Sequence, residues 1–148
     1  FKKQHPEDKH QLLIVGEALF SNSFGEIIIS DELKQYIHFT GHLSLEELAL
    51  VMASASVFTF VPYFEGFGIP LVEAMRCGTP IISADATCLP EVAGDAAIYC
   101  DPFNVEDIAN GMLILLNNEN LRNELKKKTF PVGSSTERKS LEEAVRRA

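Results

Sequence analysis

Five short apolar runs recur along the chain and limit the class of fold that it can adopt. They are residues 12–16, 36–41, 56–62, 79–83 and, with a weaker pattern, 97–100. Each run has the length of a buried strand, and the first three end in a glycine or a proline that starts a turn. Stretches with a helical repeat lie between them, so strands and helices alternate. This alternation predicts an α/β fold, a Rossmann-like parallel sheet with helices on both faces.

The helices are predicted from their ends as well as from their apolar stripes. Ser44 and Glu47 fit a capping box, which places the start of a helix at the next residue after Ser44. A second helix is expected to have Pro70 at its first position and Gly78 just beyond its end. Two more are predicted over residues 105–116 and 119–127. Residues 22–33 are ambiguous, because three consecutive isoleucines favour a strand, whereas the position between two strands favours a crossover helix; we expect the helix.

Length and composition indicate one soluble domain followed by a short tail. The chain has 148 residues, 46% of them hydrophobic and 23% charged, which is ordinary for one globular domain. The composition changes near Phe130. We therefore predict a domain over residues 1–130, and a linker with a C-terminal helix over residues 131–148.

The charge and the cysteines exclude several classes of function. A formal charge of −8 argues against a nucleic acid partner, and it requires local donors for any bound phosphate. The three cysteines have no C-x-x-C spacing, so we expect neither a disulfide framework nor a zinc site. No apolar run has the length of a membrane span. These features predict a cytoplasmic location.

The densest chemical signal lies where the third apolar run passes into a helix. A strand that ends near Val61 is followed by Gly66 and Gly68, which allow an anion to approach the backbone closely. Such a turn lies at the carboxyl edge of a parallel sheet, where open α/β folds bind ligands. The amides of Phe67, Gly68 and Ile69 stand at the helix entrance without intrahelical partners. These donors, with the positive end of the helix dipole, predict a site for a diphosphate.

Two carboxylates, Glu65 and Glu73, flank this turn. Carboxylates accept hydrogen bonds from vicinal hydroxyls, so one on each side of a diphosphate could hold a sugar and a ribose. In the alternative interpretation, Glu73 complements the helix dipole from the first turn and Glu65 is a turn residue. The spacing alone does not decide between the two.

Around this turn the sequence resembles the retaining glycosyltransferases of the GT-B type, especially glycosyltransferase family four. Glu65 and Glu73 stand at the Glu-x7-Glu spacing of that family. The matching segments are residues 65–70, 73–75, 77–80, 89–96 and 101–102. The resemblance extends from about residue 3 to residue 128 and implies the nucleotide-sugar-binding, C-terminal half of a two-domain enzyme.

The resemblance also implies roles for individual residues. Glu65 is the expected catalytic residue and would contact donor-sugar hydroxyls near the reacting carbon. Glu73 would bind the ribose hydroxyls. The backbone that would hold the sugar and the diphosphate is that of Gly66, Phe67, Gly68 and Ile69. The residues expected beside the nucleotide base are Thr40, Gly41 and His42. Metals and cofactors are not expected.

The resemblance further implies parts that this sequence does not contain. The family's domain begins with a strand, a glycine-rich turn and a helix, roughly 30 residues that carry a basic pair. An N-terminal acceptor-binding domain is also expected, so we predict that the isolated chain is inactive. A glycan or lipid-linked acceptor, with peripheral contact to the cytoplasmic membrane face, follows from the same resemblance. Two alternatives are a nucleotide-sugar epimerase or hydrolase, and a noncatalytic nucleotide-sugar-binding module.

Overall fold

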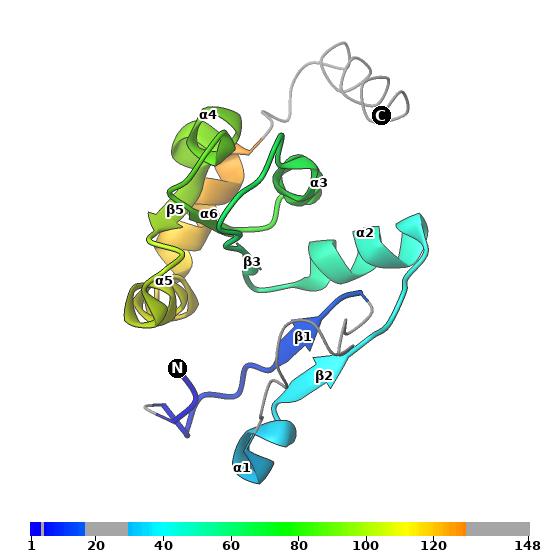
Figure 1. Cartoon of the computed structure of the whole chain (residues 1–148), viewed down its shortest axis with the longest axis vertical. Coiled ribbons are helices and arrows are strands. Elements are labelled where there is room, and N and C mark those ends of the chain that lie inside the picture. Colours follow the sequence, from blue (N-terminus) through cyan, green and yellow to red (C-terminus); the bar gives the residue numbers. More distant parts are fainter. Residues whose placement is uncertain (4, 17–29, 130–148) are drawn as a thin grey trace. The chain divides into compact units, whose positions relative to one another are not determined.

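The computed structural model describes residues 1–3, 5–16 and 30–129 of the chain (Figure 1). These residues belong to two compact units, one from Phe1 to Val51 and one from Met52 onward. The predicted tail, residues 131–148, lies outside the described residues, and so does most of the helix expected over residues 22–33. At the end of that stretch the structure describes a short helix, α1 (Asp31–Lys34), which extends one residue beyond it.

The first unit contains two parallel strands, β1 (Leu12–Ile14) and β2 (Ile37–Phe39), with Leu12 opposite Ile37. Both strands were predicted, but the expected burial of β1 was wrong, because its side chains are 36–45% exposed. Among the described residues β1 pairs with β2 alone, so its side chains lack the cover that a central strand receives on both faces.

Helix α2 (Leu45–Ser54) begins in the first unit and confirms the predicted capping box. The backbone N–H of Ser44 donates to Glu47 Oε2 at 2.8 Å, and the N–H of Glu47 donates to Ser44 Oγ at 3.2 Å. These reciprocal bonds satisfy two donors that a helix start would otherwise leave open.

The second unit contains a parallel sheet in the order β3 (Phe58–Phe60), β4 (Ile81–Ala84), β5 (Ala97–Cys100). All four residues of the central strand, β4, are buried. The predicted parallel pairing is confirmed. It occurs as one sheet in each unit, and among the described residues no strand pairing joins the two sheets.

Four helices follow the strands of this sheet (Figure 1). They are α3 (Ile69–Cys77), α4 (Leu89–Ala93), α5 (Val105–Asn117) and α6 (Glu119–Lys128). Ile81 packs with buried residues of α3 and α4, whereas its neighbour Ile82 packs with buried residues of α5 and α6. Successive side chains of a strand point to opposite faces, so helices cover both faces of the sheet, as predicted.

Two details of the helices differ from the prediction. Helix α3 begins one residue earlier than expected, at Ile69, although Gly78 lies just beyond its end as predicted and donates its N–H to the carbonyls of Ala74 and Met75. Helix α4 was not predicted; Pro90 lies in its first turn, and a 3₁₀ turn, Gly94–Ala96 (η1), follows it. Proline has no N–H and a fixed φ, which suits it to a helix start. Helix α4 has only five residues, too few to show a helical repeat in the sequence.

Candidate functional site

The turn between β3 and α3, residues 61–68, has the strand–turn–helix form that the sequence predicts. It ends at Gly68, the residue before the start of α3. The backbone of Gly68 has φ 85° and ψ 39°, in the left-handed region. A Cβ atom at this position would lie 2.9 Å from Leu89 Cδ2. Both the left-handed backbone and the close side chain therefore require glycine at residue 68.

The carboxylate of Glu65 folds back onto this turn. Its Oε1 accepts hydrogen bonds from the N–H of Gly68 at 3.1 Å and from the N–H of Phe67 at 3.2 Å. Two of the three amides that were predicted to bind an anion therefore donate to a carboxylate of the same turn. The bonds from Gly68 and Phe67 keep the pKa of Glu65 below its ordinary value. Glu65 is therefore ionised at neutral pH and acts as a hydrogen-bond acceptor.

Cys88 connects this turn to the loop that follows β4. Its Sγ donates to the backbone carbonyl of Glu65 at 3.4 Å, and the next residue, Leu89, is fully buried beneath Gly68. Neither contact was predicted from the sequence. The signal that could have indicated them is position, because loops after neighbouring parallel strands meet at one sheet edge.

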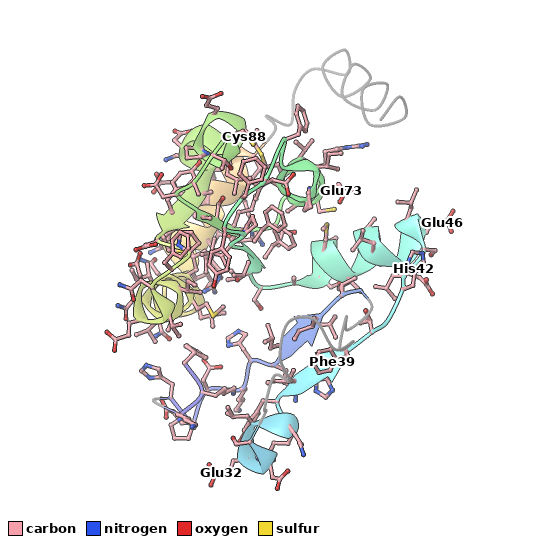
Figure 2. The ribbon with its side chains drawn as sticks, in the orientation of Figure 1. Glu32, Phe39, His42, Glu46, Glu73 and Cys88 are labelled. Atoms are coloured by element: carbon pink, nitrogen blue, oxygen red, sulfur yellow. The ribbon has the colours of Figure 1, made fainter. Side chains whose placement is uncertain are left out.

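Glu73 is the fifth residue of α3 and so lies in its second turn, not in the first as predicted (Figure 2). Its side chain is half-buried. Burial raises the pKa of Glu73, while the positive charge of Arg76 opposes this shift. Helix-dipole effects fall off beyond the first turn, so the position does not favour the interpretation of Glu73 as a dipole partner.

Thr40, Gly41 and His42 follow β2 in the first unit, as the sequence predicts. Thr40 donates its N–H to Ile14 at 3.0 Å and its hydroxyl to the carbonyl of Gly41 at 2.9 Å. Gly41 has φ 67° and accepts from the N–H of Gly16 at 3.0 Å, while the side chain of His42 is exposed (Figure 2). This segment is described within its own unit, and its contact with a nucleotide base stays a prediction.

The described residues contain neither a cluster of metal-ligating side chains nor a membrane-spanning helix. No group of three or more His, Cys, Asp or Glu residues in this part of the chain could hold a metal ion. No helix described here is both long enough and apolar enough to cross a bilayer.

Comparisons with known proteins show the family to which this chain belongs. The family model described as "Glycosyl transferases group 1" matches residues 1–130. The "O-antigen chain mannosyltransferase B" of Escherichia coli is 38% identical over 87 residues, 59% of this chain and 23% of that protein. A "Serotype-specific mannosyltransferase WbdA" of the same organism is 39% identical over 124 residues, 84% of this chain and 14% of that protein.

The solved structures agree on the fold. Sucrose-phosphate synthase from Thermosynechococcus elongatus matches with a TM-score of 0.68 and 26% identity, over 80% of this chain and 32% of that chain. The fold is therefore the α/β fold of GT-B glycosyltransferases. The chain belongs to the glycosyl transferases group 1 family. It spans less than a third of each of the three relatives described here.

Proposed function

We propose that this chain is the donor-binding part of a retaining glycosyltransferase. The complete enzyme would move a sugar from a nucleotide-diphospho-sugar to a glycan or lipid-linked acceptor. The observation that carries the proposal is the Glu65 carboxylate, which the amides of Phe67 and Gly68 hold at the entrance of α3. The family and the Glu-x7-Glu spacing support the same assignment.

Glu65 would act by charge and not by proton transfer. Its lowered pKa keeps it ionised, so it suits hydrogen bonds from donor-sugar hydroxyls and is a poor general acid at neutral pH. The transition state would resemble an oxocarbenium ion that departs from a nucleoside diphosphate. The Glu65 carboxylate beside the sugar and backbone amides at the entrance of α3 beside the diphosphate would stabilise the separating charges. Catalysis would rest on this electrostatic stabilisation and on positioning.

Other parts of the site follow from the same proposal. Glu73, on the second turn of α3, would accept hydrogen bonds from the ribose hydroxyls. Thr40, Gly41 and His42 would lie beside the base. Amides and basic residues would offset the diphosphate charge, so the proposal includes neither a metal nor a cofactor. We further propose that the enzyme works in the cytoplasm, with peripheral contact to the membrane, and that the isolated chain does not transfer sugar.

The transferred sugar can be proposed from the names of the relatives. Several of them, including the two Escherichia coli proteins, are named mannosyltransferases. We therefore propose mannose as the donor sugar and a polysaccharide as the product.

An amide NMR titration of the full 148-residue chain with GDP-mannose and UDP-glucose tests the proposal. We expect shifts centred on Gly66, Phe67 and Gly68, and the loss of those shifts in Glu73→Ala. The matched control is Glu119→Ala, which removes an exposed carboxylate from the start of α6 and should leave the shifts unchanged. Millimolar nucleotide sugar that leaves the turn unshifted, or an equal loss in the control, would contradict the proposal.

A further inference from the structure

Four aromatic side chains stand exposed on the loops that follow β3 and β5. Their exposed fractions are 67% for Tyr63, 79% for Phe64, 63% for Phe67 and 74% for Phe103. Two of them, Tyr63 and Phe103, stack with ring centroids 4.6 Å apart and an interplanar angle of 14°. We call this stacked pair the aromatic platform. Apolar side chains that are exposed singly are ordinary, whereas exposed apolar side chains that lie together can form a binding surface.

The loop that carries one ring of the platform is held by its own hydrogen bonds. The N–H of Phe103 donates to Asp101 Oδ1 at 2.9 Å, and the N–H of Asp101 donates to Asp107 Oδ2 at 2.8 Å. Asn104 Oδ1 caps α5 by accepting from the N–H groups of Glu106 and Asp107. Since the loop is ordered before any ligand arrives, binding on the platform costs little conformational entropy.

The charge around the platform selects the class of ligand. The neighbouring acidic side chains are Asp101, Glu106 and Asp107. Aromatic faces also carry negative potential, so the whole surface disfavours phosphates, anionic lipids and nucleic acids. It complements a neutral sugar, whose C–H groups can lie against a ring while its hydroxyls donate to carboxylates. A neutral oligosaccharide fits this surface better than any anion.

The platform also lies at the edge of the sheet that carries the candidate site. Tyr63 is two residues before Glu65 in the same turn, and Phe103 follows β5 of the same parallel sheet. Both residues are therefore at the carboxyl edge of that sheet. We propose that Tyr63 and Phe103 form a stacking site for a pyranose ring of a neutral oligosaccharide. This inference rests on the proposed function, because a sugar acceptor must come to the donor sugar for transfer to occur.

The test is a titration of the full chain with an α-linked mannotetraose, followed by amide NMR. We expect shifts around the platform, and dissociation constants about three- to tenfold weaker in Tyr63→Ala and in Phe103→Ala. Tyr63→Phe keeps the ring and should keep the affinity. The matched control is Val105→Ala, which changes a side chain that is 79% exposed and apolar but not aromatic. The rings are exposed, and unchanged amide spectra elsewhere will show that each variant is folded.

Several outcomes would overturn this inference. One is equal affinity for the tetrasaccharide in the wild type and both alanine variants. Another is that Tyr63→Ala and Phe103→Ala abolish self-association, or binding to phosphatidylglycerol vesicles, while oligosaccharide binding is absent. A parallel titration with GDP-mannose separates the two proposals. Donor shifts at Gly68 without oligosaccharide shifts would refute the platform alone, whereas oligosaccharide shifts without donor shifts would refute the donor site.

Discussion

Replacing Gly68 with alanine should destabilise the second unit. The expected loss in the free energy of unfolding has two parts. The first part is backbone strain, because φ is 85° and an L side chain in the left-handed region costs about 1–2 kcal/mol. The second part is steric, because the new Cβ would lie 2.9 Å from Cδ2 of the fully buried Leu89. Overpacking of this kind costs about 1–3 kcal/mol. We expect a total loss of about 2–5 kcal/mol in the free energy of unfolding.

Two other glycines provide matched controls for the two parts. Gly78 also has a left-handed backbone, with φ 69°, but a Cβ there would meet nothing within 4 Å. Gly78→Ala should therefore cost only the backbone part, about 1–2 kcal/mol. Gly66 is outside the left-handed region and its Cβ would also meet nothing within 4 Å. Gly66→Ala should change the free energy of unfolding by less than about 1 kcal/mol in either direction.

The assay is urea unfolding followed by the methyl NMR signals of Ile82, because this residue is buried in the second unit and reports on the unfolding of that unit. A double-mutant cycle with Leu89→Ala isolates the steric part, since that substitution removes Cδ2. Equal losses in Gly68→Ala and Gly78→Ala would refute the contact with Leu89. A loss in Gly68→Ala no larger than that in Gly66→Ala would refute the left-handed backbone as well.

Four further predictions concern the carboxylates of Glu65 and Glu73 and two other hydrogen bonds. Folding lowers the pKa of Glu65, so its stabilising effect is present above the ordinary value of 4.5 and is lost as pH falls through the folded pKa. Glu65→Gln should therefore destabilise at pH 7, and the loss should shrink steadily as the pH of the urea unfolding is lowered through the folded pKa. Burial raises the pKa of Glu73, so stability is lost as pH rises through that pKa, and Glu73→Gln should stabilise at pH 7 but not at pH 4 in the same assay. The buried Thr79 hydroxyl donates to the carbonyl of Met52 at 2.6 Å, so Thr79→Val should cost about 1 kcal/mol by thermal unfolding, with Thr79→Ser as the control that keeps the donor. Ser44→Ala should lower the stability of α2 by about 0.5–2 kcal/mol, seen as faster amide exchange in its first turns, whereas Ser44→Asp should keep the cap.

The sequence predicts the strands of the second unit well because each strand is a complete apolar run. The run at residues 97–100 coincides with β5, and the run at residues 79–83 contains most of β4. Burial on both faces of a parallel sheet makes these runs continuous, and so they stand out without any repeat. The run at residues 12–16 looks the same in sequence, yet β1 is exposed. An apolar run predicts that a strand is present, but it does not show which neighbouring strands and helices cover that strand.

Within the candidate site, the predictable features are those formed by residues close together in the sequence. The turn, its glycines and the start of α3 follow from local backbone requirements, and all three are present. The contacts that Cys88 and Leu89 make with the turn join residues more than twenty positions apart. The stacking of Tyr63 on Phe103 joins residues forty positions apart. Only the spatial order of β3, β4 and β5 brings these side chains to one edge.

The hydrogen bonds of Glu65 also constrain how the turn can hold an anion. Each amide has one proton, and the protons of Phe67 and Gly68 are directed at Glu65 Oε1. A diphosphate cannot receive full bonds from the same two amides while the carboxylate stays in place. A carboxylate beside a diphosphate would also be repelled by it. Donor binding at this turn therefore requires either that the diphosphate uses other donors at the helix entrance, or that Glu65 moves from the amides to the sugar hydroxyls. In both cases the carboxylate and the phosphates occupy separate places, which is the arrangement that would stabilise a positive sugar carbon on one side and a negative leaving group on the other.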